Sequence, residues 1–476
     1  MQVLISGATG FIGRALVPLL QRHGHTVVVL VRSEIRARNL LGADVSIISM
    51  THDLSTLAAA MSGCDAVVNL AGAPLVGKRW TTARRRVLEA SRIGVTEQLV
   101  RAIEAASPRP SVFVSGSAVG YYGDRANEEL TETSASTDDF LSRLCQKWEK
   151  AATKAKNLGV RVVNLRTGVV LGRAGGALTQ MLPPFQMGVG GPIGSGRQYF
   201  PWIHLHDLVK IIVRALTDDR FVGPVNAVAP QQTTNREFTQ LLGLALKRPA
   251  IIPLPAFVLQ VIFGQASVVL LGSQRVQAAF LMSQAFVWDF PKLSAALEDV
   301  LTGTKVAIRT VLSPPADAIG ARYELTMTTV VDTPITEAFA FFSKPDNLGL
   351  LTPATMKFSS KGKSPTVALN TALEHQLRIG MIPLRWRSRI IAWEPGRRFV
   401  DRQELGPYQL WWHEHTFSAD GERTIMGDRV CYTPPLGLLG RMVHQIFIAA
   451  MLRQIFQYRS DVIRLRFGDA VSRPSE

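Results

Sequence analysis

Three glycines at regular spacing near the N-terminus, Gly7, Gly10 and Gly13, are the first residues whose pattern suggests chemistry. A turn of this form lets an unobstructed backbone approach a pyrophosphate and sets the N-terminus of the next helix against the anion. We expect the whole turn, including Thr9, Phe11 and Ile12, to bind a dinucleotide. Because a bare glycine-rich turn has the same spacing, the surrounding elements must support this interpretation.

The residues after the second apolar run, 26–31, indicate which dinucleotide binds. A fold selective for NAD places Asp or Glu there, about 20 residues after the glycine turn, to hold the ribose 2′-hydroxyl. This chain has Arg32 and Ser33, with Arg36 a few residues further on. A guanidinium and a hydroxyl suit a 2′-phosphate, so the sequence favours NADP(H). The alternative is that Arg32 is simply an exposed residue at a strand end.

Short apolar runs that alternate with helical segments must position these groups. Residues 3–6 lead directly into the glycine turn, and Leu16, Leu19 and Leu20 follow it with helical spacing. Such alternation predicts an α/β fold, a Rossmann-type doubly wound parallel sheet that binds ligands at the carboxyl ends of its strands. The expected strands are residues 3–6, 26–31, 66–70, 111–115 and 160–166.

The pattern changes in the last third of the chain. Residues 303–321 have the Pro, Ala and Ser content of a linker, and residues 323–331 then alternate with period two. We expect an α+β domain at 322–470 after a first domain at 1–302, whose apolar extension covers about 247–300. Its expected elements are a helix at 334–342, strands at 373–379, 385–393, 399–405, 409–417 and 424–432, and a long helix at 440–466.

Composition limits the class of protein. The chain has 476 residues, of which 47% are hydrophobic and 19% charged, and this excludes a disordered chain. A formal net charge of +16 first suggests nucleic acid or an anionic membrane as partner. Residues 322–476 hold 20 basic and 15 acidic residues, which leaves +11 for residues 1–321, so neither part is a basic tail. We therefore expect no specific nucleic-acid partner.

The cysteines and the apolar runs predict a compartment. Cys64, Cys145 and Cys431 are far apart and odd in number, which argues against a disulfide framework and favours reducing conditions. The N-terminus opens directly into a strand pattern, unlike a signal peptide. The longest apolar run, 256–272, is interrupted by polar residues and short for a membrane span. We expect a soluble, cytoplasmic protein with no transmembrane segment; the sequence carries no signal for its oligomeric state.

Five motifs in order resemble those of one known group. Over roughly residues 1–300 the chain resembles the nucleoside-diphosphate-sugar epimerase-like family, an atypical short-chain dehydrogenase/reductase group. The resemblance implies that Leu70 and Ala71, followed by Gly72, border the adenosine of the cofactor, and that Arg92 and Val170 also touch it. The motifs are GATGFIG at 7–13, NLAGA at 69–73, SGSAVGYYG at 115–123, Trp148-Glu149, and FPWIH at 200–204.

The chain departs from the catalytic pattern of the wider superfamily. Members of that superfamily use Tyr and, four residues later, Lys, whose ammonium lowers the pKa of the phenol so that Tyr can move a proton while hydride transfers. When the expected helix at 139–154 is aligned on Trp148-Glu149, Leu141 falls at the tyrosine position and Cys145 at the lysine position. Both groups are missing, so any redox or epimerase chemistry must proceed without them.

Residues after the fourth strand are candidate substitutes. Ser117 matches a serine that would bond a substrate oxygen, although a strand-end serine that satisfies the backbone fits equally well. Tyr121 and Tyr122 are the nearest phenols and candidate proton donors, with packing as the alternative. Cys145 is more typical of a small core residue than of a nucleophile.

One group with metal-binding chemistry follows the motif at 200–204. His204, His206 and Asp207 lie close in sequence, but no fourth ligand is evident. Two histidines beside an aspartate in an ordered loop are more often structural, with His204 at the substrate cleft as the alternative. We expect no metal site.

The second half resembles the START/polyketide-cyclase-like (SRPBCC) superfamily, with fewer motifs. Residues 323–331, 334–342 and the run GPYQLWWHEHTF at 406–417 carry the resemblance. It implies a helix-grip fold, in which an antiparallel sheet wraps the last helix around a cavity for an apolar small molecule or lipid. The alternative is a solid aromatic core. No metal spacing is evident here, and His413 and His415 favour cross-strand pairing over catalysis.

Three functions compete at this point. The first is an NADP(H)-dependent oxidoreductase or sugar-nucleotide epimerase-like enzyme with a small-molecule substrate and an appended domain for a hydrophobic ligand. The second is a catalytically silent, NADP(H)-responsive binding or regulatory protein, which the residues Leu141 and Cys145 favour. The third is association of a basic protein with an anionic membrane or nucleic acid.

Overall fold

The computed structural model describes residues 1–42, 45–50, 53–173, 175–302, 306–353, 356, 358–360, 367–379, 382–435 and 437–468. The chain divides into two compact units, Met1–Glu34 with Val45–Leu301, and Ile35–Asp44 with Thr302–Glu476. Within the described ranges, no helix combines the length and the apolar character needed to cross a membrane.

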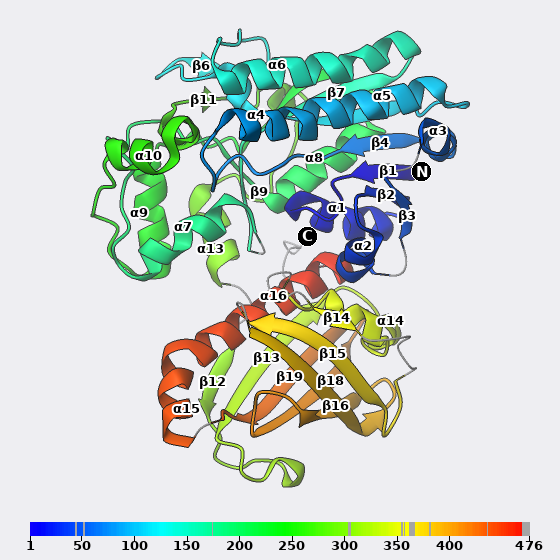
Figure 1. The fold of residues 1–476 in the computed structure, drawn as a ribbon, viewed down its shortest axis with the longest axis vertical. Helices are drawn as coiled ribbons and strands as arrows, with labels where there is room; N and C mark the ends of the chain where they lie inside the picture. Colours follow the sequence, from blue (N-terminus) through cyan, green and yellow to red (C-terminus); the bar gives the residue numbers. More distant parts are fainter. Residues whose placement is uncertain are drawn as a thin grey trace. The chain divides into compact units, whose positions relative to one another are not determined.

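A seven-stranded parallel sheet is the framework of the first unit (Figure 1). The strand order is β10-β7-β5-β4-β1-β2-β3, which places β1 between β2 and β4. Its central strands read as continuous apolar runs because helices cover both faces, α5 and α6 on one and α1 and α8 on the other. The strands are β1 (Gln2–Ser6), β2 (Thr26–Val31), β3 (Ser46–Ser49), β4 (Ala66–Asn69), β5 (Val112–Ala118), β7 (Arg161–Thr167) and β10 (Gly223–Ala227).

This sheet confirms the expected α/β class and all five expected strands, and it adds two that the sequence did not predict. The two additions, β3 and β10, are the edge strands. β3 reads SIIS and β10 reads GPVNA, so neither has the continuous apolar run of a central strand. β3 is at most half-buried, and β10 is mostly buried but contains Gly, Pro and Asn, which are uncommon in strands, so both leave a weak signal.

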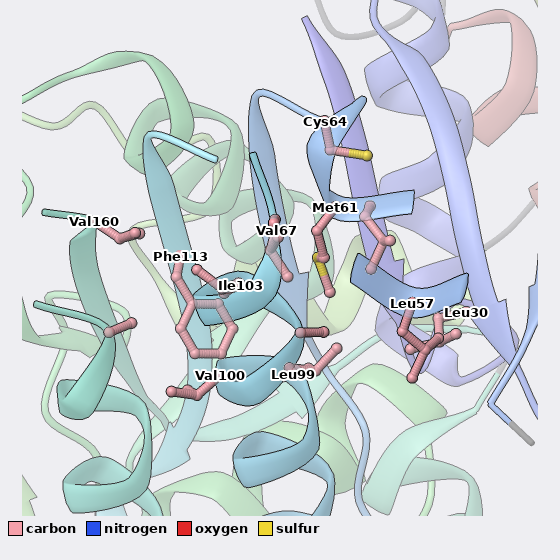
Figure 2. Packing of buried hydrophobic residues seen from close by; sticks show 14 of the residues in the cluster. Leu30, Leu57, Met61, Cys64, Val67, Leu99, Val100, Ile103, Phe113 and Val160 are labelled. Atoms are coloured by element: carbon pink, nitrogen blue, oxygen red, sulfur yellow. The ribbon is translucent and has the colours of Figure 1, made fainter. Parts of the chain in front are cut away.

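The longer helices of the first unit bury an apolar face. Leu99 and Ile103 of α5 point toward Val67 of β4 and Phe113 of β5, and Met61 of α3 packs into the same cluster (Figure 2). The helices up to residue 302 are α1 (Phe11–Arg22), α2 (Glu34–Leu41), α3 (Leu54–Ser62), α4 (Thr82–Glu89), α5 (Val95–Ala105), α6 (Phe140–Thr153), α7 (Gly176–Gln186), α8 (Leu205–Thr217), α9 (Asn235–Leu246), α10 (Ala256–Phe263), α11 (Val268–Leu271), α12 (Ala279–Ser283) and α13 (Leu293–Thr302).

Two short parallel strand pairs lie outside the seven-stranded sheet, and one of them includes a strand of the C-terminal extension. β8 (Val169–Leu171) pairs with β9 (Trp202–His204), and β6 (Glu129–Leu130) pairs with β11 (Arg275–Val276). His204 therefore ends a strand and caps α8, and Asp207 lies in the first turn of that helix, where an ordered loop was expected. That expectation was wrong because the buried run Trp202–His204 is only three residues long, too short for a periodicity signal.

An eight-stranded antiparallel sheet forms the second unit, in the order β12-β13-β19-β18-β17-β16-β15-β14. The expected helix at 334–342 and the expected strands are confirmed. The long C-terminal helix is also present, with one π-helical turn at His444–Ile448 between α15 and α16. The elements are β12 (Ala307–Thr310), β13 (Tyr323–Val331), α14 (Ile335–Phe342), β14 (Ser359–Ser360), β15 (Ala372–Ile379), β16 (Ile382–Glu394), β17 (Arg398–Leu405), β18 (Leu410–Asp420), β19 (Arg423–Thr433), α15 (Gly437–Val443) and α16 (Ala449–Phe467).

Part of the stretch expected to be a linker is a strand. β12 lies inside residues 303–321 and pairs antiparallel with β13. Ile308 packs against the core of this unit, and the Arg309 guanidinium donates to Glu324 at 2.8 Å, which explains why the chain is ordered there. Residues 303–305 of the expected linker and 469–470 of the expected second domain lie outside the described residues.

Candidate functional site

The glycine turn joins the end of β1 to α1. Gly7 has a φ of +76°, and a Cβ there would stand 2.5 Å from the Leu70 carbonyl carbon and 2.7 Å from the Ala71 nitrogen. The amide of Gly10 donates to the Gly7 carbonyl at 2.9 Å and closes the turn. Only glycine permits both the positive φ and the close approach, so the turn and the loop after β4 form one surface.

Helix α1 begins directly on this turn. A Cβ on Gly13 would stand 2.5 Å from the Ala8 Cα, so the first turn of the helix packs against the backbone that precedes it. Gly10 is the N-cap and brings no side chain to cap the helix, and it is exposed, while Thr9 and Ile12 beside it are half-buried. Uncapped amides and the helix dipole make this end attractive to an anion.

Phe11 is held by glycines that the sequence analysis did not consider. A Cβ on Gly172 would stand 2.8 Å from Phe11 Cζ, and one on Gly176 would stand 2.8 Å from Phe11 Cε1 and 3.0 Å from the Val170 carbonyl oxygen. The segment after β8 thus folds over the first residue of α1. This contact brings Phe11 and Val170, both predicted site residues, to the same place.

Buried hydrogen bonds fix the loop after β4. Asn69 Oδ1 accepts from Ser6 Oγ at 2.6 Å and from the Ala71 amide at 3.2 Å, and its Nδ2 donates to Thr96 Oγ1 at 2.8 Å. Trp148 Nε1 donates to the same threonine oxygen at 2.9 Å. Two of the five sequence motifs, NLAGA and Trp148-Glu149, therefore meet in one network that holds Ala71 in position.

Arg92 lies buried beside this loop. Its Nη2 donates to the Ala73 carbonyl at 3.0 Å, and a Cβ on Gly72 would stand 3.2 Å from its Cζ. Burial lowers the pKa of Arg92 to about 10, so the guanidinium stays charged at neutral pH. Its contacts support the loop from behind; a contact with the adenosine stays a prediction.

The residues expected to read the 2′-phosphate follow β2. Arg32 and Ser33 are exposed directly after Val31, the last residue of that strand. Arg36 is exposed on α2. An exposed guanidinium and hydroxyl at the carboxyl end of a parallel strand are where a ligand of this fold binds.

Buried side chains that cannot transfer a proton near neutral pH occupy the two positions at which the wider superfamily carries Tyr and Lys. Leu141 and Cys145 both lie on the buried face of α6, whose N-cap Asp139 accepts from the Leu141 amide at 2.8 Å. Burial raises the pKa of the Cys145 thiol to about 12. Neither residue has a group that titrates near neutral pH, which agrees with the interpretation of Cys145 as a core residue.

Ser117 belongs to a buried ion-pair network. Its hydroxyl donates to Glu149 Oε1 at 2.7 Å, and Arg166 donates to both carboxylate oxygens of Glu149 at 2.9 Å each. Of the two alternatives for Ser117, the structure does not favour a hydroxyl that satisfies the backbone, because this hydroxyl donates to a carboxylate of α6; a contact with substrate stays a prediction. A bidentate pair of this kind fixes the geometry of both side chains.

The two tyrosines are tied into the same network. Tyr122 is fully buried, donates to Asn226 Oδ1 at 2.7 Å and accepts from Arg166 Nη1 at 3.0 Å. Burial raises its pKa to about 12. The ring of Tyr121 lies under the Arg166 guanidinium, 3.5 Å from its Cζ. The hydrogen bonds of Tyr122 and the ring contact of Tyr121 tie both residues into the structure. They favour the packing alternative for both residues over proton donation.

The histidines after the motif at 200–204 are also structural. His204 Nε2 lies 3.2 Å from Asp299 Oδ2, and Asp207 accepts from the amides of Asp289 and Phe290 at 2.8 and 3.1 Å. In the described part of the chain, these residues are not among the groups that could hold a metal ion.

A cleft of about 530 Å³ lies within the first unit, between α6 and the helices of the extension. Leu141 lines it, so the position of the missing tyrosine faces this space. Asp124 and Asp139 also line it, but both carboxylates accept backbone amides. Arg85 Nε is buried there and has no hydrogen-bond partner among the described residues.

The sequence profile of the NAD dependent epimerase/dehydratase family matches residues 3–227, which include the glycine turn, the Asn69 loop and the Ser117 network. A bovine relative, epimerase family protein SDR39U1, is 43% identical over 306 residues, which are 63% of this chain and 100% of the relative. The chain belongs to the NAD dependent epimerase/dehydratase family. A second profile, a domain of unknown function (DUF1731), matches residues 254–300.

Solved structures resemble the same part of this epimerase-family chain. The structure of human epimerase family protein SDR39U1 (isoform2) with NADPH is 40% identical, has a TM-score of 0.57, and covers 63% of this chain and 99% of that one. The nucleoside-diphosphate sugar epimerase from Corynebacterium glutamicum is 32% identical with a TM-score of 0.51, and covers 63% of this chain and 58% of that one. These matches confirm the resemblance predicted for residues 1–300.

Proposed function

We propose that the first unit binds NADP(H) at the glycine turn between β1 and α1. The observation that carries this proposal is the uncapped N-terminus of α1, which begins at an exposed Gly10. The human relative solved with NADPH supports it. When bound, such a cofactor supplies or accepts a hydride.

Each part of the cofactor, the pyrophosphate, the adenosine and the 2′-phosphate, is assigned to its own residues. The amides of the turn and of the first helical residues bind the pyrophosphate, and Leu70 and Ala71 border the adenosine. Arg32 and Ser33 bind the 2′-phosphate, because the guanidinium offers charge-assisted hydrogen bonds that a 2′-hydroxyl would not require. The family is named for NAD, so the preference for NADP(H) rests on these two residues and on the human relative solved with NADPH.

The function best supported is an NADP(H)-responsive binding protein without Tyr–Lys catalysis. Leu141 and Cys145 occupy the catalytic positions, and Ser117 and Tyr122 are held by buried partners. A proton donor of suitable pKa is therefore not found among the groups that the sequence offered for this role.

A second candidate is an enzyme of reductase or epimerase type. The cleft beside Leu141 favours it, because the buried and unpartnered Arg85 Nε would bond an oxygen of a substrate seated there. Incubation of the full chain with NADPH and a panel of carbonyl compounds and nucleotide sugars separates the two candidates. Turnover supports the enzyme, and NADPH binding without turnover supports the binding protein.

We further propose that the second unit is an SRPBCC-like ligand-binding domain. Its sheet packs on α16 through Leu325, Trp411 and Phe456, and a cavity of about 190 Å³ remains inside, lined mainly by apolar side chains. A cavity near this size holds one aromatic ring. We expect small aromatic molecules to raise the unfolding midpoint of the full chain, and Leu377→Trp, which fills the cavity, to remove that rise.

A further inference from the structure

Four titratable side chains of the second unit share one face of its sheet. Asp401 on β17 lies opposite His413 on β18, and His415, two residues further on, lies opposite Asp428 on β19. Side chains that are opposite or two residues apart in an antiparallel sheet point to the same side. Three of them, Asp401, His413 and His415, line the cavity of about 190 Å³. The predicted cross-strand pairing of the histidines is confirmed.

Asp428 holds one nitrogen of each imidazole. Its Oδ1 lies 3.0 Å from His413 Nε2 and 3.0 Å from His415 Nδ1. Arg459 Nη2 lies 3.2 Å from the same oxygen and 3.0 Å from His415 Nδ1. The Asp428 carboxylate accepts from His413 Nε2. His415 Nδ1 lies between the Asp428 carboxylate and the Arg459 guanidinium, so it either donates to the first or accepts from the second.

The other nitrogen of each ring lies near Asp401. His413 Nδ1 lies 3.6 Å and His415 Nε2 lies 3.5 Å from Asp401 Oδ2, and the three candidate ligand atoms lie within 4.8 Å of one another. Ligand atoms about 2.0–2.2 Å from a tetrahedral metal ion are separated by about 3.3–3.5 Å.

We propose that Asp401, His413 and His415 form a binding site for a divalent transition metal ion of the zinc or iron(II) class. Two imidazoles and one carboxylate are a donor set that these ions accept, with positions left for further ligands. Asp428 acts as the outer carboxylate that orients both rings. The remaining coordination positions face the cavity, and this last step alone rests on the proposed ligand-binding role of the second unit.

The charges of the cluster fit a cation. Asp401 and Asp428 bring two carboxylates and Arg459 brings one guanidinium, so these three side chains together carry one uncompensated negative charge. A buried charge without compensation is costly. A metal ion, or a proton on one imidazole, would supply the missing positive charge, and the experiment distinguishes these two.

The test is a titration of the tag-free full chain, dialysed against chelator, with Co²⁺ followed by visible absorption and then with Zn²⁺ in competition. We expect one Co²⁺ per chain, with d–d bands typical of nitrogen ligation that Zn²⁺ abolishes. Asp401→Asn should weaken binding at least about tenfold, and Asp428→Asn by about 10- to 100-fold, as for other outer-shell partners.

The matched control is His375→Asn. His375 lines the same cavity but is not part of the cluster, so its variant should bind Co²⁺ like the unchanged chain. Zn²⁺ should raise the unfolding midpoint of the unchanged chain and of His375→Asn but not of His415→Gln. The proposal is overturned if the unchanged chain shows no stoichiometric binding, which would leave a protonated imidazole as the compensating charge. Equal binding by Asp401→Asn and His375→Asn would overturn it as well.

Discussion

A Cβ atom on Gly7 would stand 2.5 Å from the carbonyl carbon of Leu70. The turn after β1 and the loop after β4 are therefore in backbone contact, and no side chain fits between them. Both segments belong to the proposed NADP(H) site, so this contact sets the distance between the residues for the pyrophosphate and those for the adenosine.

Gly7→Ala should destabilise the first unit far more than Gly24→Ala. The two glycines have nearly the same φ, +76° and +75°, but a Cβ on Gly24 meets nothing within 4 Å. Left-handed backbone costs about 1–2 kcal/mol for alanine, and the collision with Leu70 adds about 1–3 kcal/mol. Urea denaturation of both variants measures the difference. Equal losses would show that the contact with Leu70 is loose.

Glu149→Gln should lower the free energy of unfolding by about 3–5 kcal/mol, because it leaves the buried Arg166 without its ionic partner. The control is Glu89→Gln, whose carboxylate meets Lys147 at 3.9 Å with both side chains exposed. Such a surface pair contributes about 0–1 kcal/mol. Thermal and chemical unfolding compare the two variants, and a small effect at Glu149 would mean that the network is not structural.

All three cysteines should resist thiol reagents in the native protein. Each cysteine is free and buried. Burial raises the pKa of the Cys64 thiol, and it raises the pKa of Cys145 to about 12 and that of Cys431 to about 11. A raised pKa keeps the unreactive thiol form through pH 8, so labelling should appear only on unfolding or at strongly alkaline pH. Rapid labelling of Cys145 at pH 7 would contradict this prediction and would support a role for Cys145 as a nucleophile.

The sequence predicted the sheet and the glycine turn because both depend on local signals. Buried parallel strands are continuous apolar runs. At Gly7 no other residue type fits, because a Cβ atom would collide with the backbone of Leu70. The edge strands β3 and β10 escaped prediction because serines in β3 and Gly, Pro and Asn in β10 interrupt the apolar run. The strand β12 escaped because its order depends on pairing with β13 and on the packing of Ile308, which are not local signals.

The contacts of the candidate catalytic residues could not be predicted from the sequence, because their partners are distant along the chain. Ser117 finds its acceptor 32 residues away, and Tyr122 finds Asn226 104 residues away. Asp401 likewise joins His413 and His415 only through the register of β17 with β18. Spacing within one segment carries no information about such partners, so the sequence could not bring Asp401 together with the two histidines.

Arg32→Ala should weaken NADPH binding by about 10- to 100-fold and leave NADH binding unchanged, because a charge-assisted hydrogen bond to the 2′-phosphate contributes about 1.5–3 kcal/mol. Arg22→Ala removes the same charge at the opposite end of α1 and should leave both affinities unchanged. Isothermal titration calorimetry measures the four affinities. A parallel loss for NADPH and NADH would place Arg32 outside the 2′-phosphate site.

The most direct test of the central claim is isothermal titration of the unchanged full chain with NADPH and, separately, with NADH. The geometry of the glycine turn with Arg32 and Ser33 predicts one NADPH per chain, bound at least about tenfold more tightly than NADH. An absence of NADPH binding at high micromolar concentration, or a preference for NADH, would contradict the claim.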